Sequence, residues 1–159
     1  MHGESRSRRT SIDLDIVRRT VDLSTHAVDT LGYLYAVSAL TVVGGNVFAV
    51  GQEQAMMNHY LFKLSSDGST HTQFFTQNFS GNETLTTDGS NIYVGDSEHL
   101  WKVDPSGTGT QIFGADQQSG VLLGPSPVAG VNAIGGLSYA DGYGLLLTDL
   151  SEDSVLRYK

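Results

Sequence analysis

Leu85–Thr108 reads LTTDGSNIYVGDSEHLWKVDPSGT, and the alternation of short apolar runs and turns in this stretch decides the fold. Ile92–Val94 is β-branched and aromatic, as in a half-buried strand. Asp88–Asn91 and Asp104–Gly107 are turn signals, because glycine takes positive φ without steric cost and aspartate bonds to nearby backbone N–H groups. The stretch predicts an antiparallel meander of four strands, at Leu85–Thr87, Ile92–Val94, Leu100–Val103 and Thr108–Phe113.

The same order of signals occurs upstream, from Leu40 to Phe75, and downstream, from Leu137 to Tyr158, where a fourth strand is lacking. Matched leucines at 40, 85 and 137 are separated by 45 and 52 residues, which is within the spacing of four-stranded propeller blades once loop insertions are allowed. We therefore expect an all-β chain of β-propeller blades, each a four-stranded antiparallel meander, in an incomplete ring.

The N-terminal region has a different composition. Residues 1–11 are polar and basic and predict a disordered leader. Ile12–Val21 and Val28–Leu31 match the last two strands of a blade, although a helix over Ile12–Leu23 is a competing interpretation. The predicted organisation is a leader at 1–11 and a partial propeller at 12–159, divided into 12–32, 33–78, 79–116 and 117–159.

Composition and charge exclude several classes of site and partner. The chain has no cysteine, which excludes disulfides and thiolate metal sites, and no apolar run approaches the length of a membrane span. We recognise no signal peptide and expect a soluble chain of undetermined compartment. From residue 20 onward, four Lys and Arg residues stand against fourteen Asp and Glu residues, so an acidic body is expected to repel nucleic acid.

Residues 85–107 resemble the repeats of NHL and YncE-like β-propellers, through the pattern Leu85-x-x-Asp88-Gly89-x-Asn91-Ile92-Tyr93-Val94-x-Asp96 and then Leu100-x-Lys102-Val103-Asp104-x-x-Gly107. The resemblance covers residues 16 to 159, and it favours an extracytoplasmic location. It implies rings of six or seven blades, whereas this chain supplies about three and a half. Either the chain is a fragment of a longer product, or a homodimer completes the ring by sharing terminal strands.

Loop lengths predict the binding face. We expect the connections between second and third strands, and those between blades, to be longer than the others and to lie on one face. A protein or small-molecule ligand is expected there, on binding residues Gln52, Glu53, Met56, Met57, His59, Asp96, Glu98, His99 and Asp149.

Asp96, Glu98 and His99 lie close together, and Asp149 recurs at the matching place in the next copy. Resemblance to lactonase-type propellers would allow a divalent cation such as Ca²⁺ here, with no other cofactor. The alternative is that Asp96 and Asp149 cap turns by accepting backbone hydrogen bonds, since structural roles recur in every repeat.

No catalytic set is recognisable in the sequence. The leading hypothesis is a non-catalytic propeller segment that acts as a binding scaffold. The alternatives are a fragment of a propeller enzyme, a lactonase-like hydrolase or lyase with a divalent metal near the channel mouth, and a structural fragment without activity of its own.

Overall fold

The computed structural model describes residues 17–21, 28–53, 58–79, 82–114, 120–124 and 129–158. These residues form strands, turns and loops, with no helix among them and hence none long and apolar enough to cross a membrane. The strands are β1 (Val17–Val21), β2 (Val28–Tyr33), β3 (Tyr35–Val43), β4 (Asn46–Gln52), β5 (His59–Leu64), β6 (His71–Phe79), β7 (Thr84–Thr87), β8 (Ile92–Asp96), β9 (His99–Val103), β10 (Gly109–Phe113), β11 (Ile134–Ala140), β12 (Gly144–Asp149) and β13 (Ser154–Tyr158).

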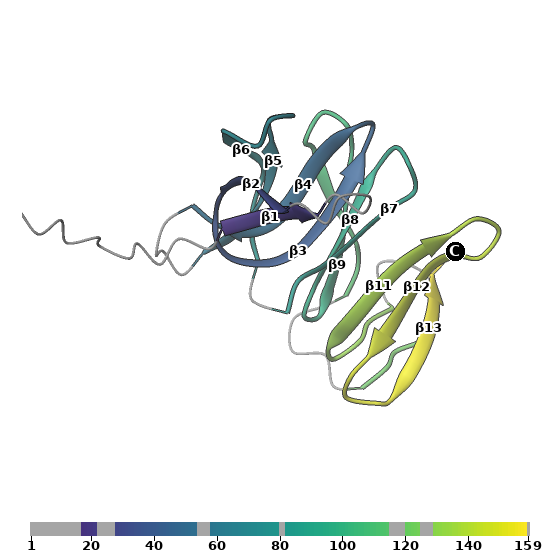
Figure 1. Cartoon of the computed structure of the whole chain (residues 1–159). Coiled ribbons are helices and arrows are strands. Elements are labelled where there is room, and N and C mark those ends of the chain that lie inside the picture. The colour runs from purple at the N-terminus through teal and green to yellow at the C-terminus, as the bar shows by residue number, and fades with distance from the viewer. Residues whose placement is uncertain are drawn as a thin grey trace, which may run out of the picture.

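The strands pair into three antiparallel meanders and one hairpin. We call β3–β6 the first sheet, β7–β10 the second sheet and β11–β13 the third sheet; β1 and β2 form the N-terminal hairpin. Neighbours in sequence are neighbours in each sheet. The first strands β3, β7 and β11 also lie next to one another, and the sheets fan out from them, with the third sheet at one end of the row (Figure 1).

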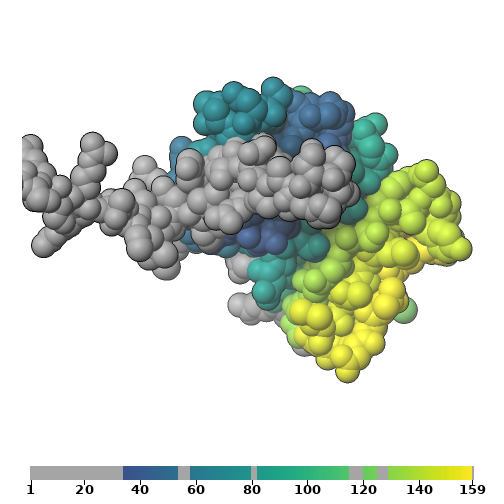
Figure 2. Space-filling view, viewed as in Figure 1, coloured from purple at the N-terminus to yellow at the C-terminus, as the bar shows by residue number. Residues whose placement is uncertain are grey.

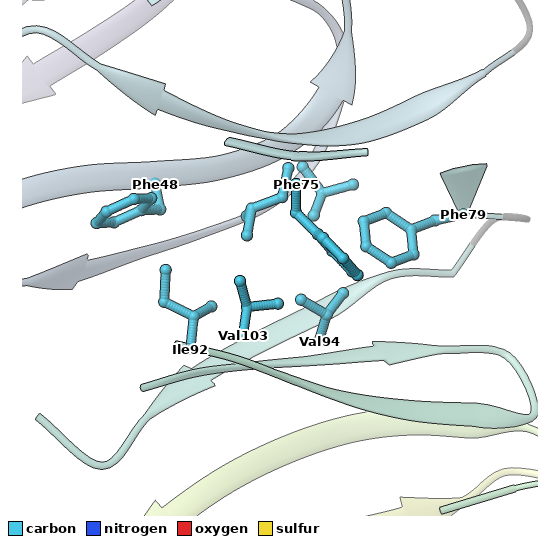
Figure 3. Packing of buried hydrophobic residues seen from close by; sticks show 8 residues of the cluster. Phe48, Phe75, Phe79, Ile92, Val94 and Val103 are labelled. Atoms are coloured by element: carbon cyan, nitrogen blue, oxygen red, sulfur yellow. The ribbon is translucent and has the colours of Figure 1, made fainter. Parts of the chain in front are cut away.

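An apolar core fills the space between the first and second sheets (Figure 3). Phe75 and Phe79 of β6 meet Ile92 and Val94 of β8 there, and Val94 is fully buried. Burial of a side chain of this size stabilises the fold by roughly 1.5–3 kcal/mol. This core holds the first two sheets face to face; its other buried members are Phe48, Val50, Leu61 and Val103.

A second core lies between the second and third sheets. Tyr93 of β8 points into it, whereas its neighbours Ile92 and Val94 point into the first core. Alternation along a strand therefore divides β8 between the two cores, and all of its residues are buried. The other buried members of this second core are Leu100, Phe113, Ala129, Val131, Ile134, Leu145 and Leu147.

The expected fold class is confirmed. The described residues form an all-β array of antiparallel sheets, each packed face to face on the next, and the array does not close. This is the arrangement of a partial propeller. The strand interpretation also holds for Val17–Val21, which is β1 and not a helix; residues 12–16 lie outside the described residues, as does the predicted leader at 1–11.

Two expectations are corrected. The inner strand of the first sheet begins at Tyr35 rather than Leu40. A bulge with Ala36 at φ +43° shifts the register there, so the sequence before Leu40 does not show the alternation of a regular strand. The connection between β8 and β9 is not long, since Ser97 and Glu98 alone link the two strands. The run Asp96–His99 was predicted to lie on a loop, but its two end residues pair across the ladder.

Candidate functional site

The predicted binding residues that the structure describes lie at strand ends on one face, which we call the long-loop face. Gln52 ends β4 and is half-buried, Glu53 is exposed, and Met56 and Met57 lie outside the described residues. His59 begins β5, Asp96 ends β8, His99 begins β9 and Asp149 ends β12, with Glu98 in the two-residue turn. Strand ends thus position most of these side chains.

Asp149 caps the turn between β12 and β13. The residue is 1% exposed, and its carboxylate accepts hydrogen bonds from Ser151 N at 2.7 Å and Glu152 N at 3.2 Å. Its second oxygen accepts one from Asn132 N at 3.0 Å, which ties the segment before β11 to the same turn. The capping interpretation is confirmed for Asp149.

The same observation bears on metal binding. The backbone N–H groups that surround the Asp149 carboxylate present positive ends of dipoles, which compete with a cation for the same oxygens. Among the described residues, no three His, Asp or Glu side chains are placed to hold a metal ion. Asp96, Glu98, His99 and Asp149 are therefore not gathered as such a set, and a Ca²⁺ site, which takes six to eight oxygen ligands, stays a prediction.

One contact on the long-loop face was not predicted from the sequence. His59 Nδ1 lies 2.9 Å from Glu83 Oε1, and the Glu83 side chain is fully buried. Glu83 belongs to the link between β6 and β7, so the contact joins the first and second sheets. The contact becomes an ion pair when the imidazole is protonated. Neither residue carries a local sequence signal for it.

The opposite face carries the tight turns, and a groove of about 330 Å³ opens there between the first and second sheets. The rings of Phe48 and Phe74 form its floor, edge to face with centroids 4.9 Å apart. Lys63 Nζ lies 6.0 Å from the centre of the Phe48 ring. The rest of the lining is Val43, Gly44, Asn46, Gly89, Ser90, Ile92, Asp104 and Pro105.

Asp104 places a negative charge on the rim of this groove. A hydrogen bond from the Ser106 hydroxyl, and one from Thr108 N at 3.0 Å, lower the pKa of its carboxyl group below the ordinary 3.8. The carboxylate is therefore ionised at neutral pH. With Lys63 across the groove, the rim offers both a hydrogen-bond acceptor and a donor.

A related hollow of about 260 Å³ lies between the second and third sheets. Tyr93 and Lys102 pair across β8 and β9 as Phe48 and Lys63 pair across β4 and β5, so the two hollows occupy equivalent places. Its lining has no carboxylate and consists of Tyr93, Lys102, Ile112, Tyr139, Gly144, Leu145 and Tyr158. The carboxylate on the rim thus distinguishes the first groove from the second.

The turn beside the groove is organised by Asp88. Its carboxylate accepts bonds from Ser90 N at 2.8 Å, Asn91 N at 2.7 Å and the Tyr93 hydroxyl at 2.8 Å. Partial burial favours the neutral acid, but the hydrogen bonds from Asn91 and Ser90 outweigh it and lower the pKa of Asp88 well below its usual range. Burial, followed by the bond to Asp88, raises the pKa of Tyr93. These hydrogen bonds hold together the turn that carries Gly89 and Ser90, which line the groove.

The described residues thus form a propeller-like array of antiparallel sheets, with a groove between the first two. No protein-family model matches the chain, and no curated protein is similar to it in sequence. Among solved structures, the chain is similar to a structural genomics protein of unknown function from Bacteroides thetaiotaomicron, with a TM-score of 0.59 and 17% identity over 84% of this chain and 39% of that one. It also matches an oligogalacturonate lyase in complex with manganese, with a TM-score of 0.41 and 14% identity over 86% and 40% of the two chains. The chain spans about two fifths of the length of each, and the first similarity supports the fold.

Proposed function

We propose that the chain is a non-catalytic β-propeller scaffold that binds an apolar segment of a partner protein in the groove between its first and second sheets. The observation that carries the proposal is the aromatic floor of Phe48 and Phe74 below a rim that holds both Lys63 and Asp104. An apolar side chain can pack on the floor while its flanking amides bond to the rim. The volume of about 330 Å³ is at the lower end of that of ligand pockets.

The pattern of residues 85–107 supports placing this scaffold with the NHL and YncE-like propellers. Gln52, Glu53, Glu98 and His99 stay predicted contacts for a second ligand on the long-loop face. In the described part of the chain, the buried Asp149 serves a turn, which supports a structural role for the polar residues there. A scaffold of this kind needs no metal for binding.

A titration with N-acetylphenylalaninamide, which carries an aromatic ring between two amides, tests the proposal. We expect its NMR chemical-shift changes to centre on Phe48, Lys63 and Phe74, with affinity on the order of 1 mM because the probe is small. Lys63→Met should weaken binding about three- to tenfold by removing a charged donor. Lys102→Met, at the equivalent position of the second sheet, is the matched control and should leave the affinity unchanged.

Two outcomes would contradict this function. One is an absence of shifts at the groove, or shifts scattered over the surface, at about 10 mM probe. The other is binding of a divalent cation, which a fragment of a propeller enzyme would require. Adding CaCl₂ or MnCl₂ is expected to leave the melting temperature unchanged, whereas a saturable rise would show binding to the folded chain and favour the enzyme.

A further inference from the structure

The second and third sheets each present a short row of side chains to the other. In Figure 2 the third sheet, yellow-green to yellow, lies against the teal of the second sheet. Tyr93 and Lys102 pair across β8 and β9, so their side chains lie on one face of the second sheet. The opposing row on the third sheet pairs across β11, β12 and β13 and consists of Tyr139, Leu145 and Tyr158. All five residues line the hollow of about 260 Å³, which therefore lies between the two rows.

Aromatic rings form much of the wall of this hollow. Tyr93, Tyr139 and Tyr158 contribute one ring each, and aliphatic side chains from β10 and β12 add apolar surface. Burial is the largest cause of the raised pKa of Tyr93, followed by its contact with Asp88 and then by the phenols of Tyr139 and Tyr158. The three phenols therefore lie close to one another. Rings arranged in this way can pack against the face or edge of a further ring.

Lys102 supplies the charge of the hollow. In the part of the chain that the structure describes, its ammonium group has no ion-pair partner, and the hydroxyls of Tyr139 and Tyr158 make no hydrogen bond. An ammonium group can donate three hydrogen bonds and a phenol can donate one. The hollow thus offers a positive charge and several donors, and its lining includes no carboxylate to accept from them.

The Tyr93 hydroxyl, in contrast, is already engaged by the carboxylate of Asp88. Asp88 Oδ2 accepts hydrogen bonds from the Tyr93 hydroxyl at 2.8 Å and from Asn91 Nδ2 at 2.9 Å. Asp88 Oδ1 accepts from the backbone N–H groups of Ser90 and Asn91. These donors offset the negative charge of Asp88, which is not among the residues that line the hollow. The groups left to meet a ligand are those of Lys102, Tyr139 and Tyr158.

We propose that the hollow between the second and third sheets is a second binding site, for small carboxylates that carry an apolar ring. The carboxylate accepts hydrogen bonds from Lys102 and from the hydroxyls of Tyr139 and Tyr158, while the ring packs on the tyrosine rings and on Leu145. Pockets for drug-sized ligands measure roughly 300–1,000 Å³. A hollow of about 260 Å³ therefore suits a smaller ligand, of about ten non-hydrogen atoms.

The charge at the rim separates the ligands of the two hollows. In the first groove Lys63 shares the rim with Asp104, which repels a carboxylate but accepts a hydrogen bond from an uncharged amide. Lys102 occupies the equivalent position in the second hollow without such a neighbour in its lining. The Debye length is about 8 Å at physiological ionic strength, so acidic groups farther away add little repulsion. The second site is made of other residues, so its test is separate from that of the proposed function.

Titrations with benzoate and with benzamide, its uncharged counterpart, test this site by NMR on the full chain at neutral pH. We expect benzoate to shift the signals of Lys102, Tyr139 and Tyr158, with a dissociation constant on the order of 1 mM. Benzamide should bind there at least about tenfold more weakly. Lys102→Met should weaken benzoate binding about tenfold or more, because it removes the charge and its hydrogen bonds. Lys63→Met, at the equivalent position of the first sheet, is the matched control and should leave the benzoate affinity unchanged.

Two further comparisons separate the hydroxyl from the ring. Tyr158→Phe keeps the aromatic wall and should weaken benzoate binding about three- to tenfold. Acetate, which lacks the ring, should bind at least about tenfold more weakly than benzoate. Circular dichroism should show the same β content in every variant.

Several results would overturn this second site. They are equal affinities for benzoate and benzamide, an unchanged benzoate affinity in folded Lys102→Met protein, and benzoate shifts that centre on Phe48 and Lys63. An absence of shifts at about 20 mM benzoate would overturn it as well.

Discussion

Replacing Gly114 with alanine is expected to cost about 3 kcal/mol or more of folding free energy. Gly114 follows β10 with φ +98°, a conformation that L-residues avoid. A Cβ there would overlap the carbonyl oxygen of Glu98, which belongs to the tight β8–β9 turn. Gly114 N also donates to Ala129 O at 3.0 Å, so the backbone cannot shift without losing a hydrogen bond.

The Gly142→Ala variant separates the cost of the positive φ from the cost of the steric overlap. Gly142 has φ +79°, but nothing lies within 4 Å of the position that a Cβ would occupy. It should therefore show the conformational cost alone, about 1 kcal/mol. Guanidinium unfolding of the wild type and both variants gives the comparison. Equal losses of unfolding free energy in the two alanine variants would contradict the close approach of Gly114 to Glu98.

Replacing Asp149 with alanine is expected to cost about 3–4 kcal/mol. The change leaves three backbone N–H groups without their acceptor, at Asn132, Ser151 and Glu152. Buried donors without partners carry a desolvation penalty, and these three hold both the β12–β13 turn and the entry to β11. Asn at this position keeps one carbonyl acceptor and should lose about half as much.

Asp141→Ala is the control for Asp149. Asp141 is also an aspartate of a turn in the third sheet, but it is exposed, so its loss should change the unfolding free energy by less than about 0.5 kcal/mol. The measurement is again a denaturant midpoint, made with and without CaCl₂. A loss at Asp149 that appears only with calcium present would show that the carboxylate binds the ion instead of capping the turn.

The strands were predictable where the sequence pattern is local. Ile92–Val94 is β-branched and aromatic and is bounded by two turn signals, and it became β8. The matched leucines at 40, 85 and 137 are on the inner strands, as the repeat predicts. Local patterning succeeds here because each meander folds on contacts between neighbouring strands.

The candidate site was less predictable, because it depends on how the sheets stack. The groove joins Lys63 of the first sheet to Asp104 of the second, which are 41 positions apart in the sequence. The contact between His59 and Glu83 likewise crosses from one sheet to the next. The pairing of Phe48 with Lys63, repeated as Tyr93 with Lys102, was the available signal for the two hollows. Short polar runs such as Asp96–His99 remain ambiguous between a loop and a two-residue turn.

The central claim is that successive meanders pack side by side through their inner strands. The most direct test is a nuclear Overhauser measurement on β7 and β11, whose residues Thr86 and Tyr139 are 53 positions apart and joined by a 3.1 Å hydrogen bond. We predict a cross-peak between the Tyr139 amide proton and the Thr86 side chain, together with contacts between Leu137 and the second sheet. Absence of these cross-peaks in a folded chain whose β11–β12 pairing is intact would contradict the account.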